Sequence, residues 1–342
     1  MAIETISKVL VRRLFSASTL PRIPFIPWVY SHCARLEQVS VRTMVTDPEQ
    51  LSKALKNAQN LYGYDAVVCP FDPSLEAEAC GCTLAWQSDN ELPRVVSGLP
   101  AVVQADTYPS YVSELSRMGR LGIVLEAMRR LRIVLAQKVA LVAVVTGPVS
   151  LAQLLLGRDI TQELIERPDN AKMVLSMSSQ VVLKVCKLYC ELQPDIVAVA
   201  DDLVVCLPPK HLGMVAPLFQ PIGNIARFYN VWPVLVTKVQ SNTGLEVVAN
   251  LNMDGVVIGG MAGLAEIRQL INKGLVIGIG LPSSKLTGSK KELKSLIAYY
   301  MEVSRRQKIF LSTECEFSYE TSPEVIHDLV KTVATFSAVQ DN

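Results

Sequence analysis

Short runs of hydrophobic residues alternate along the chain with longer stretches in which hydrophobic and polar positions recur every three or four residues. The short runs are rich in β-branched residues and hydrophobic throughout, which is typical of strands buried on both faces. The longer stretches are amphipathic and predict helices. This alternation predicts parallel strands joined by helical crossovers, so we expect an α/β fold.

The strand pattern occurs eight times, which predicts a (β/α)8 TIM barrel. The predicted strands are Phe25–His32, Asp65–Cys69, Val139–Thr146, Asp195–Ala200, Pro233–Val239, Gly255–Ile258, Leu275–Ile279 and Lys308–Thr313. Helices are predicted over Pro48–Tyr62 and Asn170–Leu192. A further helix should follow Ser322, because serine caps helices and the next residue, Pro323, suits the first helical position. Ser74–Asn90 is predicted to be an excursion after the second strand.

No segment rich in proline, glycine and serine divides the chain, and barrels of this length commonly form one domain. We therefore expect a single domain over residues 1–342. Four hydrophobic residues at helical spacing predict a helix in residues 1–22 that caps the barrel floor: Ile6, Val9, Leu10 and Leu14. The same region contains arginine and serine, as transit peptides do, but the helical spacing favours the cap.

The composition narrows the choice of partners. Half of the residues are hydrophobic and 33 Lys and Arg nearly balance 32 Asp and Glu, so a sizeable core is expected. A basic stripe with interleaved aromatic residues is absent, which argues against nucleic acid. No hydrophobic run reaches the roughly 18–20 residues that span a bilayer, so no membrane partner is expected. The eight cysteines are scattered in mostly apolar contexts, which fits a reducing cytoplasm.

Polar and thiol residues gather where the predicted strands end. They are His32, Cys33 and Arg35 after the first strand, Asp72, Glu76, Glu78, Cys80 and Cys82 after the second, Asp201 and Asp202 after the fourth, Lys238 at the end of the fifth, and Glu314, Cys315 and Glu316 after the eighth. Barrel enzymes place their chemistry on the loops that follow the strands. The sequence therefore predicts a working site at the C-terminal mouth of the barrel.

As a set, these strand ends resemble the uroporphyrinogen decarboxylase superfamily, which includes porphyrinogen decarboxylases and zinc methyltransferases of corrinoid pathways. The similar segments cover nearly the whole chain: Ile23–Trp28 with Ala34-Arg35, Phe71-Asp72 with Glu76 and Gly81, Val145–Pro148 with Leu151-Ala152, Gly280–Pro282 with Leu286–Gly288, and Phe310–Glu316 with Thr321–Glu324. The last segment looks like the methyltransferase branch, in which a cysteine at this place binds zinc. The resemblance implies the same barrel fold and an enzyme closer to that branch.

The chain departs from the family pattern at several positions, two of which bear most on the reaction. Porphyrinogen decarboxylases carry two arginines in the first turn, and here Ser31 stands in the place of the first, with Arg35 as the second. A porphyrinogen with many acid side chains needs many cations, whereas this mouth has mainly Arg35 and Lys238. The thiol-methylating branch has a His-x-Cys pair after strand five, and the stretch around Lys238 contains neither residue.

The resemblance makes Asp72 a candidate general acid/base or electrostatic anchor, with a turn residue before Pro73 as the alternative. Lys238 and Asp201 are the other catalytic candidates, and a structural ion pair between Lys238 and an aspartate is the alternative there. The candidate substrate-binding residues are Arg35, His32, Glu76 and Glu78. For Arg35 the alternative is a salt bridge at the rim.

Three thiols are candidates for a rebuilt zinc site. Cys80 and Cys82 can reach the same metal if the backbone turns at Gly81, and Cys315 ends strand eight, which lies beside strand one in a closed barrel. His32 is a further possible ligand at that junction. The alternative is that these cysteines are buried in the core, the commoner fate of a free cysteine.

These observations and the resemblance together predict a corrinoid-dependent methyltransferase that moves a methyl group between a small donor and a cobalamin carrier. A methoxylated aromatic or a methylamine is the donor considered, zinc is the expected cofactor, and the corrinoid is expected on a partner protein. Two alternatives stay open: a uroporphyrinogen decarboxylase or related tetrapyrrole-modifying lyase, and a non-catalytic protein that binds a tetrapyrrole or corrinoid. Family members often dimerise, so the resemblance also allows a homodimer.

Overall fold

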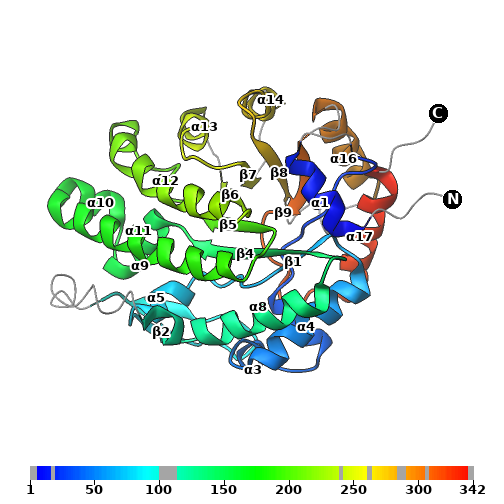
Figure 1. The fold of residues 1–342 in the computed structure, drawn as a ribbon, viewed down its shortest axis with the longest axis horizontal. Coiled ribbons are helices and arrows are strands. Elements are labelled where there is room, and N and C mark those ends of the chain that lie inside the picture. Colours follow the sequence, from blue (N-terminus) through cyan, green and yellow to red (C-terminus); the bar gives the residue numbers. More distant parts are fainter. Residues whose placement is uncertain are drawn as a thin grey trace.

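The computed structural model describes residues 6–16, 20–99, 114–238, 242–259, 264–282, 290–304 and 308–337. Its centre is a curled sheet of seven strands in the order β1-β4-β5-β6-β7-β8-β9, surrounded by helices (Figure 1). The strands are β1 (Ala66–Val68), β4 (Ala140–Thr146), β5 (Ile196–Ala200), β6 (Trp232–Lys238), β7 (Gly255–Gly259), β8 (Val276–Leu281) and β9 (Ile309–Thr313). All neighbouring pairs are parallel, so the predicted TIM-barrel class is confirmed.

Helices precede the first strand and follow each strand of the sheet along the chain. They are α1 (Ser7–Phe15), α2 (Ser31–Leu36), α3 (Val41–Val45), α4 (Pro48–Tyr62), α5 (Leu75–Ala79), α8 (Leu121–Leu135), α9 (Pro148–Leu156), α10 (Ile160–Glu166), α11 (Pro168–Glu191), α12 (Leu212–Phe228), α13 (Asn242–Ala249), α14 (Leu264–Asn272), α16 (Lys290–Ser304) and α17 (Pro323–Ser337). Two short 3-10 turns, η1 (Leu115–Arg117) and η2 (Pro209–His211), precede α8 and α12. The predicted excursion after the second strand contains α5 and leads into an antiparallel hairpin of β2 (Thr83–Ala85) and β3 (Arg94–Ser97).

Helix α4 has the bounds that its sequence predicts. The Asp47 side chain accepts hydrogen bonds from the first free N–H groups of the helix, those of Glu49 and Gln50. Pro48 occupies the first turn, where its missing N–H costs nothing. Gly63 ends the helix in the left-handed conformation, with φ of 76°. Local capping signals therefore determine both ends.

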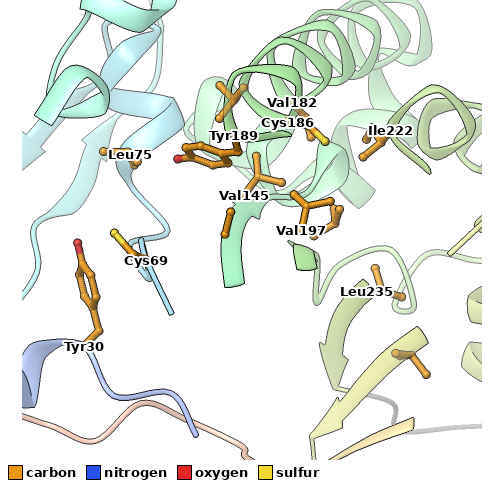
Figure 2. Close-up of a cluster of buried hydrophobic side chains, with 14 of the residues drawn as sticks. Tyr30, Cys69, Leu75, Val145, Val182, Cys186, Tyr189, Val197, Ile222 and Leu235 are labelled. Atoms are coloured by element: carbon orange, nitrogen blue, oxygen red, sulfur yellow. The ribbon is translucent and has the colours of Figure 1, made fainter. Parts of the chain in front are cut away.

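The main core lies between the outer face of the sheet and the helices. Figure 2 shows Val145, Val197 and Leu235 on successive strands facing side chains of the helix layer. Those helix side chains are Val182, Cys186 and Tyr189 of α11 and Ile222 of α12. A second cluster fills the barrel interior with the alternate residues of the same strands, such as Val144, Ala198 and Val234. This alternation explains why the strands read as hydrophobic throughout.

Helix α11 is long and apolar enough, by length and composition, to cross a membrane, although the sequence pattern predicts no such span. In the fold, 61% of that stretch is buried. Ten of its buried residues are hydrophobic or aromatic and contact the sheet and neighbouring helices. The apolar character of α11 is therefore accounted for by its place in the core.

The first predicted strand, Phe25–His32, is wrong. Only Phe25 forms a bridge, parallel to Leu311 of β9, and helix α2 already begins at Ser31. Pro24 and Pro27 lack the N–H groups that a continuous ladder requires. The other seven predicted strands are confirmed, with ends that differ by at most two residues among the described residues.

The segment around Phe25 nevertheless closes the barrel between β9 and β1. On one side, the Ile26 N–H donates to the Leu311 carbonyl at 2.8 Å. On the other side, the Asp65 N–H donates to the Phe25 carbonyl at 2.9 Å, and the Phe25 N–H donates to the Asp65 carboxylate at 2.8 Å. Arg22 donates to both oxygens of the same carboxylate, at 2.6 and 2.7 Å. Asp65 therefore replaces part of the missing ladder.

Helix α1 lies across the opposite, N-terminal end of the strands. Leu10, Val11 and Leu14 pack into the cluster that fills the barrel interior. Lys8 forms an ion pair with Asp195 at 3.3 Å, directly before β5, and the Ser7 hydroxyl donates to Asp65 at 2.7 Å, directly before β1. The helix thus covers the floor of the barrel and leaves the C-terminal mouth open.

We predict that Asp65→Ala lowers the free energy of unfolding by about 3 kcal/mol, because it leaves the Phe25 N–H and the Arg22 guanidinium without their buried acceptor. Urea denaturation measures the change. Glu320→Ala is the control, since it breaks an ion pair to Arg35 whose Glu320 side chain is 81% exposed. That variant should lose about 0.5 kcal/mol or less. Equal losses in the two variants would contradict the assigned role of Asp65.

Candidate active site at the mouth of the barrel

A cavity of about 490 Å³ opens where the C-terminal ends of the strands converge. Much of its wall is apolar and is formed by Trp28, Phe71, Val144, Leu154, Val236 and Val257. Its charged lining residues are Asp72, Asp202, Lys238, Glu314 and Glu316. Two wider hollows, of about 580 and 830 Å³, lie at the barrel floor and between α11 and α12, away from these strand ends. The mouth is therefore the cavity in which polar groups meet an apolar wall, as expected of a ligand site.

Asp72 lies in this wall and is bound on both carboxylate oxygens. Its Oδ1 accepts from the Ser74 N–H at 2.9 Å and from the Ser74 hydroxyl at 2.7 Å. Its Oδ2 accepts from Arg120 Nη1 at 2.5 Å. Both partners of this ion pair are buried. These contacts hold the negative charge of Asp72 in one position at the cavity. They go beyond the alternative role of a turn residue before Pro73.

Glu78 does not line the cavity but shares the same cation, because Arg120 Nε donates to Glu78 Oε2 at 2.8 Å. The Arg120 guanidinium also lies over the ring of Trp86, 5.4 Å from its centroid, and the Arg42 guanidinium lies over the same ring at 5.1 Å. Glu78, expected to bind substrate, thus has its carboxylate engaged by Arg120, and its role in binding stays a prediction.

Two further carboxyl groups near the cavity have no cation within 4 Å among the described residues. Glu76 is buried behind Thr146, whose hydroxyl donates to it at 2.7 Å. Glu316 is half-buried in the cavity wall and accepts from the N–H and the hydroxyl of Ser31, both at 3.0 Å. Burial raises the pKa of each carboxyl to about 7, against the opposing effect of these hydrogen bonds.

The two aspartates after β5 have different positions. Asp201 is buried outside the cavity, where it accepts from the N–H groups of Val149 and Ser150 at the start of α9. A Cβ atom at position 147 would overlap the Asp201 side chain, so the glycine there permits this close approach. Burial raises the pKa of Asp201 to about 6. Asp201, expected to be catalytic, therefore caps a helix, and Asp202 is the residue that lines the cavity.

Lys238 is at the cavity mouth, as expected, at the end of β6. Its Nζ lies 3.9 Å from Asp202 Oδ2, and its side chain is 45% exposed. Lys238 and Glu314 both lie against Gly259, where an added Cβ would approach their Cγ atoms to 3.1 and 3.2 Å. The ion pair expected as the alternative role of Lys238 is therefore observed, but it is long and exposed to solvent, so it is weak.

Arg35 and His32, expected to bind substrate, do not line the cavity, and their role in binding stays a prediction. Arg35 forms an ion pair with Glu320 at 3.5 Å and donates to the Tyr319 carbonyl at 3.4 Å, so the rim alternative is the one observed. The His32 Nε2 is 2.7 Å from the Tyr62 hydroxyl in the core. Burial, with a contribution from the charge of Arg35, lowers the pKa of His32 to about 4.

The expected thiol cluster is not formed. Cys80 and Cys82 are buried in the core, and burial raises the pKa of the Cys82 thiol to about 11 and that of Cys80 further. Cys315 is exposed and lines the cavity without them. Among the described residues, no three His, Cys, Asp or Glu side chains are placed to hold a metal ion. The loops outside the described residues contain no histidine or cysteine either, so the donor set does not fit zinc.

Arg120 is the site residue that sequence reasoning missed. It directly precedes α8, far along the chain from Asp72 and outside any strand-end motif. One signal did exist: the stretch Asp72–Glu78 contains three carboxyl residues close together, and carboxylates that become buried require a cation. That argument establishes the need for a cation but does not identify Arg120.

Comparison of sequences supports the family that the strand-end motifs resemble. A family model described as "Uroporphyrinogen decarboxylase (URO-D)" matches residues 7–336. The chain is 27% identical to methylcobamide:CoM methyltransferase MtaA of Methanosarcina barkeri over 160 residues, 46% of each protein. It is 21% identical to methylcobamide:CoM methyltransferase MtbA of Methanosarcina acetivorans over 265 residues, 72% of this chain and 76% of that one. The match to MtaA thus spans about half the length of that relative.

Comparison of structures supports the fold. A methyltransferase from Methanosarcina mazei superposes with a TM-score of 0.85 at 19% identity, over 97% of this chain and 99% of that chain. A B12-independent methionine synthase from Shewanella sp. W3-18-1 superposes with a TM-score of 0.59 at 12% identity, over 94% and 97% of the two chains. At these identities the likeness concerns the architecture alone.

We predict that Glu76→Gln removes a pH dependence of stability. The pKa of Glu76 is raised to about 7 in the fold, so the stability contributed by its protonated form is present below about pH 4.5 and lost as the pH rises to 7. From pH 5 to pH 8, the free energy of unfolding of the wild type should therefore fall by about 2–3 kcal/mol relative to that of Glu76→Gln. Urea denaturation at both pH values measures this shift.

The control for this prediction is Glu166→Gln, which neutralises an exposed glutamate of α10. Its difference from wild type should be the same at pH 5 and pH 8. A pH-independent difference for Glu76→Gln as well would contradict the raised pKa of Glu76.

Proposed function

The chain belongs to the uroporphyrinogen decarboxylase family, and from this premise we propose that it is an enzyme that moves a methyl group between a small donor and a cobalamin carrier. The relatives similar in sequence are named as methylcobamide:CoM methyltransferases. These names support methyl transfer over decarboxylation as the activity of this family member.

The charge of the cavity is the observation that carries the proposal. Among the described lining residues, four carboxyl groups accompany one ammonium, that of Lys238: Asp72, Asp202, Glu314 and Glu316, of which Glu316 is charged only in part near neutral pH because burial raises its pKa to about 7. Arg120 adds a cation behind the wall, but Asp72 and Glu78 already share it. A porphyrinogen with several acid side chains would be repelled by such a lining. The alternatives of porphyrinogen decarboxylation and tetrapyrrole binding are therefore less well supported.

The same lining favours a cationic donor. Of the two donors considered, a methylamine carries a positive charge at neutral pH and a methoxylated aromatic does not. Asp72, held by Arg120 and Ser74, would act as an electrostatic anchor for that charge. The apolar residues Trp28 and Phe71, stacked at 5.2 Å, would surround the methyl group and exclude water.

The cobalamin carrier would approach the open mouth of the barrel as part of a corrinoid protein. We assign no step to zinc, because thiol and imidazole ligands do not come together among the residues that the structure describes. The chain's own residues would then act on the donor. Asp72 would supply the negative charge, Lys238 and Asp202 would contact the donor at the rim, and the apolar wall would orient it.

We predict that the purified chain converts chemically reduced free cobalamin to methylcobalamin when mono-, di- or trimethylamine is added, as measured by the absorbance of the two cobalamin forms. Asp72→Asn should lower the rate about 10–100-fold, because it removes the fixed charge without changing the shape of the site. Glu320→Gln, on the exposed rim, is the matched control and should transfer methyl groups at the wild-type rate.

Three results would contradict the proposal. The first is a wild-type protein that transfers no methyl group from methylamines or from methoxybenzoates. The second is release of carbon dioxide from uroporphyrinogen, which would restore the decarboxylase alternative. The third is a purified protein that carries the visible absorbance of a bound tetrapyrrole without any methyl transfer.

A further inference from the structure

Arg120 is a buried cation that lies between the cavity wall and the β2–β3 hairpin. Its side chain has four partners: the carboxylate of Asp72 at 2.5 Å, the hydroxyl of Ser74 at 3.2 Å, the carboxylate of Glu78 at 2.8 Å and the ring of Trp86 at 5.4 Å. Among these partners only Asp72 lines the cavity, and Trp86 belongs to the hairpin segment. A single side chain therefore joins a cavity carboxylate to a structural element outside the barrel.

The direction of the Asp72 carboxylate depends on this cation. Ser74 binds one oxygen of Asp72, but Ser74 is only two residues away and belongs to the same loop. Arg120 binds the other oxygen across 48 positions of sequence. The Arg120 contact is thus the bond that ties the Asp72 side chain to a separate part of the fold.

The position of Arg120 depends in turn on the hairpin. Its Nη2 donates to the Ser74 hydroxyl at 3.2 Å, and its guanidinium lies over the half-buried Trp86. Arg42 lies over the same ring and is bound to the hairpin loop, where its N–H donates to the Asp89 carbonyl at 2.9 Å. The indole is therefore fixed on the side of the hairpin and constrains the guanidinium that contacts it.

We propose that Arg120 is a positioning residue: it holds the Asp72 carboxylate in the direction that methyl transfer requires, and Trp86 holds Arg120 in place. The inference rests on the proposed function. A planar guanidinium can bind two carboxylates and lie over an indole at once, whereas an ammonium supplies charge without this directed geometry. A displacement of about 1 Å at a reacting group can cost about 100-fold in rate.

The test compares Arg120→Lys, which keeps the charge, with Trp86→Leu, which keeps an apolar side chain but removes the aromatic ring. Methyl transfer from methylamines to reduced free cobalamin is measured at a temperature at which circular dichroism shows each variant to be folded. Arg120→Lys should lower kcat about 10–100-fold and Trp86→Leu about 10-fold, with KM changed by no more than about 3-fold. A loss in kcat at constant KM indicates an effect on the reacting geometry.

Trp232→Leu is the matched control for Trp86→Leu. Trp232 also forms an aromatic contact, with Phe15 at 4.8 Å, but it lies at the barrel floor and does not contact Arg120. This variant loses a stacked tryptophan with a comparable effect on stability, and its kcat should stay within about 2-fold of wild type.

A double variant separates positioning from general destabilisation. If Arg120 acts through Asp72, Arg120→Lys should have no further effect on kcat when Asp72 is already Asn. The proposal is overturned if Arg120→Lys has the wild-type kcat, if Trp86→Leu matches Trp232→Leu, or if the effects of Arg120→Lys and Asp72→Asn multiply. A wild-type protein that transfers no methyl group overturns the proposed function itself, which is a different outcome from active wild type with unaffected variants.

Discussion

The barrel has to close at a segment that cannot form a regular strand. Pro24 and Pro27 remove two N–H donors from the stretch between β9 and β1, so a continuous ladder is excluded there. The Asp65 side chain accepts the Phe25 N–H in place of a backbone carbonyl, and Arg22 balances its charge. The same junction sets the wall of the mouth, because the Phe317 N–H donates to the Trp28 carbonyl and Ser31 donates to Glu316 directly beyond it. The cavity therefore depends on how the barrel is closed.

The mouth accommodates its acidic residues in two different ways. Asp72 and Glu78 share the guanidinium of Arg120, and these ion pairs offset the free energy of removing charged groups from water. Glu76 and Glu316 have only hydroxyl and amide donors, and their raised pKa values follow from burial without a cation. The lining thus combines an ion-paired carboxylate, that of Asp72, with a carboxyl group whose pKa is raised by burial, that of Glu316.

The architecture could be predicted from the sequence where local rules were sufficient. Val139–Thr146 is hydrophobic throughout and forms β4, and α4 begins and ends at its capping residues. Local rules failed at Phe25–His32, because the hydrophobic pattern continues through prolines that prevent pairing. Placing residues at strand ends correctly located Asp72 and Lys238 in the cavity. It could not distinguish Asp201 from Asp202 or find Arg120, since those depend on contacts between distant segments.

Burial divides the eight cysteines into two chemical groups. Six are buried, and Cys206 and Cys315 are exposed. A thiolate is the form that reacts with alkylating reagents, and burial raises the pKa of thiols such as Cys33 and Cys69. With Cys206 replaced by serine, Cys315 would be the one accessible native thiol, and it borders the cavity. The folded protein thus contains its own attachment point for a fluorophore or spin label, through which occupancy of the mouth can be observed.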